Sequence, residues 1–557
     1  MGKVVKKKKK GLGGGALARS SAGRQTSALR PQTVAKKAPC GSGCPQGNKI
    51  RSVMTTIFNG EKYGRTPEES YEKAWYLFTE TNPMPATLGR VCPHPCETVC
   101  NRKDKDYPVA INNVERFVGD YGIDKNLAHK PLADKKDKKV AVVGAGPAGL
   151  GAAYHLAMNG YQVSMFEALT KAGGMLRYGI PAYRLPHAVL DAEIKKILDL
   201  GVELKTSCRI GKDITMDQLQ KEFDAVFVGI GAHKGLKLRV EGEEAEGVYS
   251  GVDFLNRISS GETIDVGKKV VVIGGGDTAI DAARISKRLG ADVTILYRRT
   301  KVEMPAIDPE IDEAEEEGID IQYLAAPIGI LKDGSRVKAI KALRMELGEP
   351  DDSGRRRPVP IEGSEFELEL DTLIPAISQE PDFAGLENLK AGPKDWIKAD
   401  EFFKSNDIYA GGDVLNLGLV TDALAHGAKA AKTIHYDLSG ETRPAEQTME
   451  VITSDKMRLD SYSKADRHEE TMLPLEERFA AIDTEIAQTL SQEDLEAEAK
   501  RCMSCGYCFD CGKCWEYCQD NAVVKGELGE IYEYKHNVCT GCKKCAEECP
   551  CGFLEMH

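Results

Sequence analysis

The sequence has no long apolar segment and no apolar stretch after its lysine-rich beginning. Nowhere in the 557 residues does a run reach the ~18 apolar residues that a membrane-spanning helix needs. Lys6 to Lys10 are followed by a glycine-rich stretch, which lacks the apolar core of a secretory signal. The net charge of −11 gives no support for nucleic-acid binding. We therefore expect a cytoplasmic protein with no membrane span and no nucleic-acid partner.

Cysteine is nearly absent from the middle of the chain. Of 17 cysteines, only Cys208 lies outside residues 40–100 and 502–551. The second group contains two C-x2-C-x2-C-x3-C runs, the spacing of a two-cluster ferredoxin, in which the last cysteine of each run binds the other cluster. Two such runs argue against zinc and against disulfides. One [4Fe–4S] cluster is thus assigned to Cys508, Cys511, Cys514 and Cys549, and another to Cys539, Cys542, Cys545 and Cys518.

A glycine-rich turn follows a short apolar strand near residue 140. The first glycine, Gly144, permits a tight turn, Gly146 lets the backbone approach a pyrophosphate, and Gly149 lets helix and strand pack closely. The next strand ends at Glu167, where a ribose hydroxyl needs an acceptor. Strand, turn, helix and acid in register predict a dinucleotide site of the FAD or NAD type.

A second strand, turn and helix pattern begins at Val270 and contains Gly274 and Gly276. Its following strand ends at Arg298 and Arg299, where the first copy has an acid. Guanidinium groups at this place favour a 2′-phosphate, so we predict NADP(H) in preference to NAD(H). The alternative is that both arginines are merely solvated at a strand end. Two dinucleotide folds predict one site for FAD and one for a nicotinamide.

These motifs resemble the family of the glutamate synthase small subunit, an NADPH oxidoreductase type shared with the electron-entry half of dihydropyrimidine dehydrogenase. The resemblance covers residues 40 to 440 approximately. It is carried by Gly89–Cys100, Val140–Gly149, Gly173–Pro181, Tyr183–Pro186, Gly274–Ala279, Glu303–Ala306 and Gly411–Asp413.

The resemblance implies which residues hold the two nucleotides. FAD would bind the first fold, with Arg184 reaching it, Asp413 on its ribityl chain and the helix from Thr421 beneath its ring. NADPH would bind the second fold, inserted in the first. The implied binding residues are Gly144, Ala145, Gly146, Pro147, Ala148, Gly149, Glu167, Gly174, Leu176, Arg184, Gly412, Asp413 and Thr421 for FAD, and Gly274, Gly276, Asp277, Thr278, Arg298 and Arg299 for the nicotinamide nucleotide.

The N-terminal cysteines depart from the family pattern. Members carry C-x2-C-x4-C-x3-C-P, but only the second pair, Cys40 and Cys44, remains here. By resemblance, one cluster takes Cys44, Cys92, Cys96 and Glu115, although a solvated helix residue is the alternative reading of Glu115. The other cluster would keep Cys40 and Cys100 and lack two ligands.

The missing pair is available far along the chain. Cys502 and Cys505 precede the ferredoxin runs, which do not need them, and their Arg-Cys-Met-x-Cys-Gly context is like the missing family segment. Cys40, Cys100, Cys502 and Cys505 would then hold a cluster, for four in total. The alternative is three clusters, with Cys502 and Cys505 as free thiols.

We therefore expect an α/β chain with two Rossmann-like domains between a helical iron–sulfur domain and a ferredoxin-like domain. The predicted units are a disordered basic tail (1–39), the helical domain (40–135), the FAD domain (136–257 and 381–440), the nicotinamide domain (258–380), a linker (441–500) and the ferredoxin domain (501–557). Within the linker, Leu475, Phe479 and Ile482 fall at helical spacing, as do Ile486 and Leu490 further on, which predicts that part of the linker is helical.

The predicted activity is that of an FAD- and iron–sulfur-dependent NAD(P)H:acceptor oxidoreductase. Hydride transfer to a flavin needs stacking geometry, so no catalytic acid or base is assigned; the flavin then releases single electrons to the clusters. The partner would be a redox protein, and the domain order and the ending Cys549–Gly552 resemble the oxidoreductase that accompanies dissimilatory sulfite reductase in sulfur metabolism. The alternative is an electron-transfer subunit of a glutamate synthase or 2-oxoacid oxidoreductase complex. Whether the chain forms a homodimer is left open.

Overall fold

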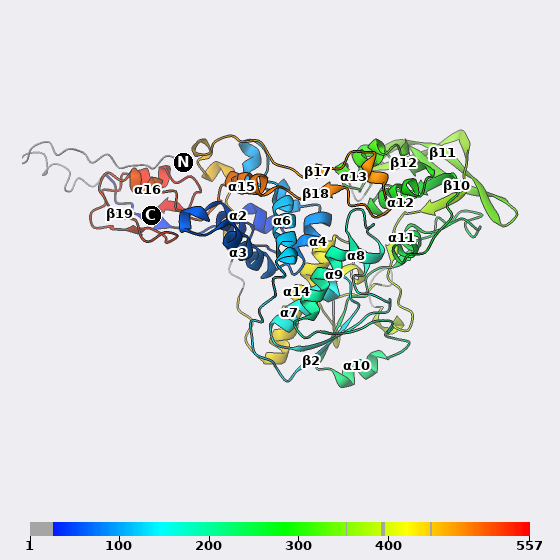
Figure 1. Ribbon diagram of the computed structural model, residues 1–557, viewed down its shortest axis with the longest axis horizontal. Coiled ribbons are helices and arrows are strands. Elements are labelled where there is room, and N and C mark those ends of the chain that lie inside the picture. Colours follow the sequence, from blue (N-terminus) through cyan, green and yellow to red (C-terminus); the bar gives the residue numbers. More distant parts are fainter. Residues whose placement is uncertain (1–25, 352–353, 391–395, 446–447) are drawn as a thin grey trace, which may run out of the picture.

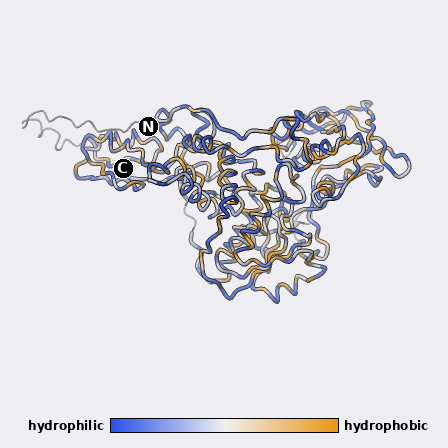
Figure 2. Tube along the Cα trace, in the orientation of Figure 1, coloured by the Kyte–Doolittle hydropathy of each residue, from blue (hydrophilic) through white to orange (hydrophobic). Residues whose placement is uncertain are grey.

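The computed structural model describes residues 26–351, 354–390, 396–445 and 448–557. Figure 1 shows the ferredoxin-like part at one end of an elongated upper layer, helices in the middle, a nicotinamide-type domain at the other end and the FAD-type domain below. In Figure 2 the apolar stretches gather inside these bodies, most plainly along the strands of the lower domain. Among the described residues, no helix is both long enough and apolar enough to cross a bilayer.

The helical domain is built on a small apolar core. Its α3 begins at a capping box in which Thr66 and Glu69 satisfy each other's backbone N–H groups. Trp75 and Phe78 of α3 are buried in this core, and Leu495 and Ala499 of α15, near the end of the predicted linker, pack into it. The helices are α1 (Pro39–Gly43), α2 (Ile50–Phe58), α3 (Pro67–Thr79), α4 (Pro85–Val91), α5 (Pro95–Thr98), α6 (Ile111–Asp124) and α15 (Gln492–Arg501).

The FAD-type domain is a sheet of order β15-β16-β5-β2-β3-β4 with helices packed on it. Helices α7 and α14 pack closely at Gly427 of α14. A Cβ at this position would lie 2.1 Å from the carbonyl oxygen of Ala148 in α7, so the contact requires glycine. Its elements are β2 (Lys139–Val143), α7 (Pro147–Met158), β3 (Gln162–Phe166), α8 (Met175–Tyr178), α9 (His187–Leu198), β4 (Glu203–Lys205), α10 (Met216–Glu222), β5 (Ala225–Val228), β15 (Lys404–Ser405), β16 (Ile408–Ala410) and α14 (Val420–Ser439).

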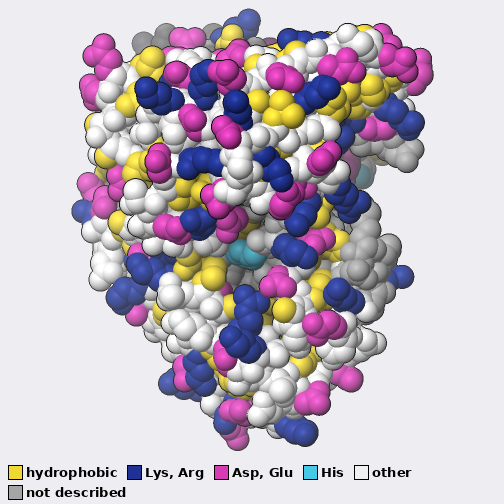
Figure 3. All heavy atoms as spheres, turned by 90° about the vertical axis from the view of Figure 1, so that its right-hand side faces the viewer, with side chains coloured by type: hydrophobic (Ala, Val, Ile, Leu, Met, Phe, Trp, Pro, Cys, Tyr) yellow, Lys and Arg dark blue, Asp and Glu magenta, His cyan; other side chains and the backbone are white. Residues whose placement is uncertain are grey.

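The nicotinamide-type domain has a parallel sheet of order β13-β7-β8-β9 and an antiparallel sheet of order β10-β11-β12. A short antiparallel pair, β6 (Lys234–Gly235) with β14 (Gln379–Glu380), lies where the chain enters and leaves it. The remaining elements are α11 (Gly251–Ser259), β7 (Lys269–Ile273), α12 (Asp277–Arg288), β8 (Asp292–Tyr297), α13 (Asp308–Glu316), β9 (Asp320–Tyr323), β10 (Ala325–Asp333), β11 (Arg336–Pro350), β12 (Arg356–Glu369) and β13 (Thr372–Pro375). Figure 3, viewed from this end, shows positive and negative side chains mixed over the surface.

The linker crosses the upper layer without the helix predicted at Leu475, Phe479 and Ile482. That stretch contains one 3₁₀ turn, Glu477–Phe479, and the pair β17 (Thr471–Met472) with β18 (Ala487–Gln488). Leu475 and Phe479 are exposed, whereas Ile482 packs on the nicotinamide-type core. The helix placed at these three residues was therefore wrong, because they meet different surroundings and do not share one helix face. The part of the predicted linker that is helical is α15.

The two ends of the chain meet in the ferredoxin-like part. Strand β1 (Pro31–Thr33) pairs antiparallel with β21 (Leu554–Met556), and Lys36 forms an ion pair with Glu555 at 2.5 Å. The predicted disordered tail at 1–39 is thus ordered from residue 26 onward, while residues 1–25 lie outside the described part. The other elements here are α16 (Lys513–Glu516), β19 (Val523–Val524), β20 (Glu533–Tyr534) and α17 (Lys544–Glu547).

Candidate functional site

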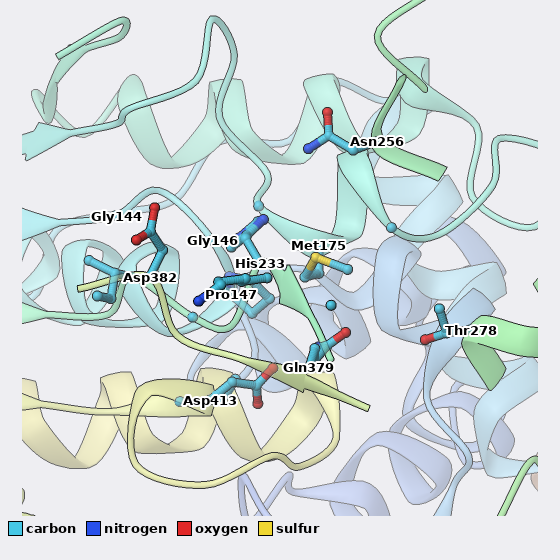
Figure 4. Close-up of a pocket in the computed structure, with 18 of the residues that line it drawn as sticks. Gly144, Gly146, Pro147, Met175, His233, Asn256, Thr278, Gln379, Asp382 and Asp413 are labelled. Atoms are coloured by element: carbon cyan, nitrogen blue, oxygen red, sulfur yellow. The ribbon is translucent and has the colours of Figure 1, made fainter. Parts of the chain in front are cut away.

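A cavity of about 1020 Å³ lies between the two dinucleotide-type domains. Figure 4 shows side chains from both domains pointing into it. It is lined by eleven residues predicted to bind a nucleotide: Gly144, Gly146, Pro147, Ala148, Glu167, Gly174, Arg184, Asp277, Thr278, Gly412 and Asp413. Eight predicted residues are not among its lining: Ala145, Gly149, Leu176, Gly274, Gly276, Arg298, Arg299 and Thr421.

The glycine turn at the end of β2 forms one wall of this cavity. Gly144 has a φ of 96°, which favours glycine, and a Cβ on Gly149 would lie 1.9 Å from the carbonyl oxygen of Gly144. Helix α7 begins directly after this turn, with Pro147 in its first turn. The free N–H groups of a helix start bind phosphate oxygens, so the wall fits a pyrophosphate.

Two carboxylates, the buried Glu167 and the half-buried Asp413, stand at other points of the cavity. Glu167 follows β3 and accepts hydrogen bonds from the backbone N–H groups of Ala145 and Leu169, both at 2.8 Å, which orient it. Burial raises the pKa of Glu167, and burial raises the pKa of Asp413 to about 6. Each can accept a bond from a sugar or polyol hydroxyl, as an FAD site requires. The residues therefore fit FAD.

Helix α14 connects this cavity to the helical domain. Thr421, predicted to lie at the flavin, is buried, and its Oγ1 accepts a hydrogen bond from Nε2 of Gln46 at 3.2 Å. Gln46 stands two residues after Cys44, while Val91 and Pro93, on either side of Cys92, line the cavity. The predicted flavin pocket and two predicted cluster ligands are thus adjacent.

The second glycine turn precedes α12. Gly274 has a φ of 144°, and a Cβ there would lie 2.2 Å from the carbonyl oxygen of Ala376. Arg299 is buried; its Nη2 binds Asp351 at 2.6 Å and its Nε donates to the carbonyl oxygen of Arg356 at 2.7 Å. Arg298 is exposed. Of the two arginines, Arg298 is therefore the one whose side chain is open to a phosphate.

Arg184 lines the cavity but is engaged by the second domain. Its Nη1 donates to both carboxylate oxygens of Asp281, at 3.0 and 2.9 Å, and its Nη2 lies 2.8 Å from Glu310. Tyr183 also donates to Asp281, at 3.1 Å. Arg184 was predicted to reach FAD. In the structure its side chain also joins the two domains through Asp281 and Glu310.

Four residues of the cavity carry polar groups that the sequence motifs do not reveal: His233, Asn256, Gln379 and Asp382. Nδ1 of His233 is buried and has no hydrogen-bond partner among the described residues, and burial lowers the pKa of this histidine. His233 follows β5 and the Gly229-Ile-Gly231 turn, which lines the cavity as well. This further glycine turn, Gly229 to Gly231 after β5, was the signal available in the sequence.

The cysteines of the two ferredoxin runs gather in the crossed pattern that their spacing predicts. Burial first, and then neighbouring thiolates that include Cys549, raise the pKa values of Cys508, Cys511 and Cys514. Burial and then the charges of Cys539, Cys518 and Cys542 raise the pKa of Cys545 to about 11. Cys549 thus lies with the first run and Cys518 with the second.

The cysteines of the helical domain form two more groups. Burial and then Glu115 raise the pKa of Cys44, and the same two causes raise the pKa of Cys92 to about 12 and that of Cys96 beyond its usual range. Burial itself raises the pKa of Glu115 to about 8. Nδ2 of Asn48 and Nδ2 of Asn82 both donate to its Oε1, at 3.0 and 2.8 Å.

The second group joins residues more than 400 positions apart. A small cavity is lined by Cys40, Cys100, Cys502 and Cys505, together with Arg51 and Met503. Burial, and then the charges of Cys502, Cys100 and Cys505, raise the pKa of Cys40. A [4Fe–4S] cube takes one ligand at each iron, so its ligands surround it. Within the described part of the chain, no three His, Cys, Asp or Glu side chains converge closely enough to hold a single metal ion.

Comparison with known proteins decides the family. Residues 138–427 match the family described as pyridine nucleotide-disulphide oxidoreductase, and residues 20–127 match dihydropyrimidine dehydrogenase domain II, 4Fe-4S cluster. The chain belongs to the pyridine nucleotide-disulphide oxidoreductase family. The predicted fold, the predicted glutamate synthase small-subunit type and the enzyme class, an FAD- and iron–sulfur-dependent NAD(P)H oxidoreductase, are confirmed.

Three relatives resemble this chain over different shares of its length. It is 38% identical over 507 residues to the NADP(+)-dependent formate dehydrogenase subunit beta of Moorella thermoacetica, covering 84% of this chain and 70% of that one. It is 44% identical over 356 residues to the NADPH-Fe(3+) oxidoreductase subunit beta of Geobacter sulfurreducens, covering 62% of this chain and about half, 52%, of that protein. It is 37% identical over 421 residues to the glutamate synthase [NADPH] small chain of Escherichia coli, covering 71% and 87%.

Proposed function

We propose that this oxidoreductase exchanges electrons between NADPH and a protein redox partner through FAD and four [4Fe–4S] clusters. The observation that carries the proposal is the spatial succession of four ligand sets, from the nucleotide cavity to the far end of the ferredoxin-like domain. When bound, FAD takes a hydride as a pair of electrons and releases the electrons one at a time. The residues of this chain would hold the nucleotides and the clusters in succession, from the cavity to the ferredoxin-like domain.

The first cluster of the series would be held by Cys44, Cys92, Cys96 and Glu115, beside the cavity. Asn48 and Asn82 both donate to Oε1 of Glu115, which leaves Oε2 for an iron. Val91 and Pro93 line the cavity on either side of Cys92, which supports a short step from flavin to cluster. Hydrogen bonds and ligand type set cluster potentials, so a carboxylate ligand would distinguish this cluster from the others.

The second cluster, on Cys40, Cys100, Cys502 and Cys505, would connect the helical domain to the ferredoxin-like domain. Tyr462 supports its place in the series. Its pKa is raised by burial first, and then by the charges of Cys551, Cys505, Cys502 and Cys511, so this ring lies between the second and third ligand sets. Its hydroxyl donates to the carbonyl oxygen of Met503 at 2.8 Å.

The third set (Cys508, Cys511, Cys514, Cys549) and the fourth (Cys518, Cys539, Cys542, Cys545) complete the series. We call the cluster on the fourth set the distal cluster. Cys511, in the third set, is exposed, and the other ligands of these two sets are partly or fully buried, so electrons can exit at this end of the molecule. A redox protein that docks there would receive electrons without contact with the flavin.

The proposal is tested by anaerobic addition of NADPH to the full chain. We expect the flavin absorbance to bleach, the cluster absorbance to fall after it, and iron analysis to give about sixteen atoms per chain, four for each cluster. Bleaching of the flavin with no change at the clusters would contradict the proposed electron path. An iron content of about twelve atoms per chain would contradict only the cluster proposed on Cys40, Cys100, Cys502 and Cys505.

Two protein partners are candidates for the electron exchange. A subunit role in a formate dehydrogenase-like complex is favoured by the relative from Moorella thermoacetica, whose match covers 84% of this chain. Dissimilatory sulfite reductase remains a prediction from the ending Cys549–Gly552. NADPH oxidation assayed with each of the two enzymes separates these candidates, because only the true partner should raise the turnover in proportion to its concentration.

A further inference from the structure

Two arginines line the cavity of the second ligand set. This set consists of Cys40, Cys100, Cys502 and Cys505. The arginines are Arg51 and Arg102. Burial raises the pKa of Cys502 to about 11, and the positive charges of Arg51 and Arg102 oppose that rise. Both guanidinium groups therefore lie close enough to the ligand set to act on the negative charge that it carries.

Arg102 is neutralised inside the protein. Its Nε and Nη2 donate to the two carboxylate oxygens of Asp106, at 2.7 and 2.6 Å. Arg501, the residue before Cys502, donates to the same carboxylate at 3.0 Å and to Glu498 at 2.6 Å. Two buried arginines thus face two carboxylates, and their charges are balanced locally.

Arg51 forms no ion pair with a carboxylate in the part of the chain that the structure describes. Its Nη1 donates to the carbonyl oxygens of Lys36 and Cys505, at 2.8 and 2.7 Å, and its guanidinium lies 5.0 Å from the centre of the Tyr507 ring. Carbonyl groups and an aromatic ring do not neutralise a cation. Because arginine stays protonated in proteins, Arg51 brings a fixed positive charge to the second ligand set.

The position of Arg51 is not explained by the stability of its helix. It is the second residue of α2 (Ile50–Phe58), at the end where the helix dipole disfavours a cation. The first turn of this helix contains no acidic residue that would offset the effect. An arginine that is kept against a local preference indicates a role beyond the helix itself.

In the first ligand set, the charge that acts most on the thiols is negative. Burial is the first cause that raises the pKa values of Cys44, Cys92 and Cys96, and the carboxylate of Glu115 is the second. Since Glu115 is also the fourth proposed ligand, each of the two sets contributes four negative groups. The second set differs by the guanidinium of Arg51 in the wall of its cavity.

We propose that Arg51 raises the reduction potential of the second cluster and thereby favours electron transfer to it from the first cluster. The inference rests on the proposed function. Reduction adds one negative charge to a cluster held by four thiolates, and a fixed positive charge in a poorly solvated site stabilises that product. One electron leaves the first cluster and one enters the second, and no bond forms or breaks. Arg51 is thus a positioning residue that directs electrons toward the distal cluster without binding iron.

Redox titration of the full chain, read by electron paramagnetic resonance, tests this role. The signal of the second cluster is the one that Cys502→Ser removes. Arg51→Gln keeps an amide that can donate to the carbonyl oxygens of Lys36 and Cys505, but it removes the charge. We expect the midpoint potential to fall by about 59 mV or more, which is a tenfold change in a one-electron equilibrium. Arg51→Lys keeps the charge and should retain most of the potential.

Arg65→Gln is the matched control, since Arg65 is also partly buried, lies in the same domain and has similar contacts. Its Nη2 donates to the carbonyl oxygen of Thr56 at 2.9 Å, and its guanidinium lies 5.3 Å from the centre of the Tyr63 ring. It does not line the cavity of the second ligand set. The control should leave the potential of the second cluster and the bleaching of the flavin by NADPH unchanged.

An unchanged potential in Arg51→Gln would overturn the proposal, and so would an equal fall in Arg51→Gln and Arg51→Lys. Should Arg51→Gln lose iron, Arg51→Met repeats the test with another neutral side chain. Loss of about four irons in both neutral variants would show that Arg51 holds the cluster in place and does not tune it. About twelve irons in the unmodified chain would instead refute the second cluster itself, so iron analysis distinguishes the two failures.

Discussion

Arg184 and Asp281 join the FAD-type domain to helix α12 of the nicotinamide-type domain through two hydrogen bonds of 3.0 and 2.9 Å. Both side chains are nearly buried, at 10% and 5% exposed. A buried carboxylate that loses its partner retains the cost of desolvation, so this pair constrains how the two domains meet over the cavity. The contact makes Arg184 a positioning residue as well as part of the cavity wall.

Arg184→Met should lower the free energy of unfolding by about 3–5 kcal/mol, because Asp281 is left buried and unpaired. Urea denaturation, followed by flavin release, measures this change. The double variant Arg184→Met/Asp281→Leu should recover most of the loss. If the double variant is no more stable than the single one, the pair does not account for the effect.

Arg298→Ala should raise the NADPH KM without a comparable change in the NADH KM. Loss of a charge-assisted contact to the 2′-phosphate costs about 1–3 kcal/mol, which corresponds to roughly 5- to 150-fold. Arg299→Ala is the comparison variant: since Arg299 binds Asp351 and the carbonyl oxygen of Arg356, its loss should reduce stability and affect both nucleotides alike. Equal kcat/KM for NADPH and NADH in the unmodified protein would refute the preference.

Glu115→Cys should keep the iron content and shift the potential and spin signal of one cluster, because thiolate replaces carboxylate at an iron. Glu115→Ala should lose that cluster. Glu193→Gln is a matched control, since Glu193 is also buried but accepts hydrogen bonds from the backbone N–H groups of Ala86 and Thr87, both at 2.8 Å. Unchanged iron, spectra and turnover in Glu115→Ala would show that this residue is not a ligand.

Cys502→Ser and Cys40→Ser should each remove about four irons from the full chain, because both belong to one cube. Substitution is a sharper test than truncation near residue 500, since Leu495 and Ala499 of α15 are part of the helical core and a cut would disturb it. Cys208→Ser serves as the control for iron content, because Cys208 lines the nucleotide cavity and belongs to none of the four ligand sets. If Cys40→Ser loses no iron, the protein holds three clusters and not four.

The local chemistry of the chain was predictable from residue spacing. The ferredoxin runs and both glycine turns depend on contacts within a few residues, where covalent geometry and backbone sterics limit the possible arrangements. Gly144 and Gly274 thus stand at the predicted turns with positive φ. Family resemblance added Glu115, whose burial among Asn48, Asn82 and the thiols of Cys44, Cys92 and Cys96 could not be derived from spacing.

The sequence by itself determined the family, the two nucleotide folds and the cysteine sets whose members are close along the chain. Only the tertiary structure decided which distant groups meet. Cys502 and Cys505 reach Cys40 and Cys100 because α15 packs into the helical core, and Pro31–Thr33 reach the ferredoxin-like domain because β1 pairs with β21. Such contacts depend on the packing of whole domains, which no local pattern encodes. The same packing assigned Arg299 to Asp351.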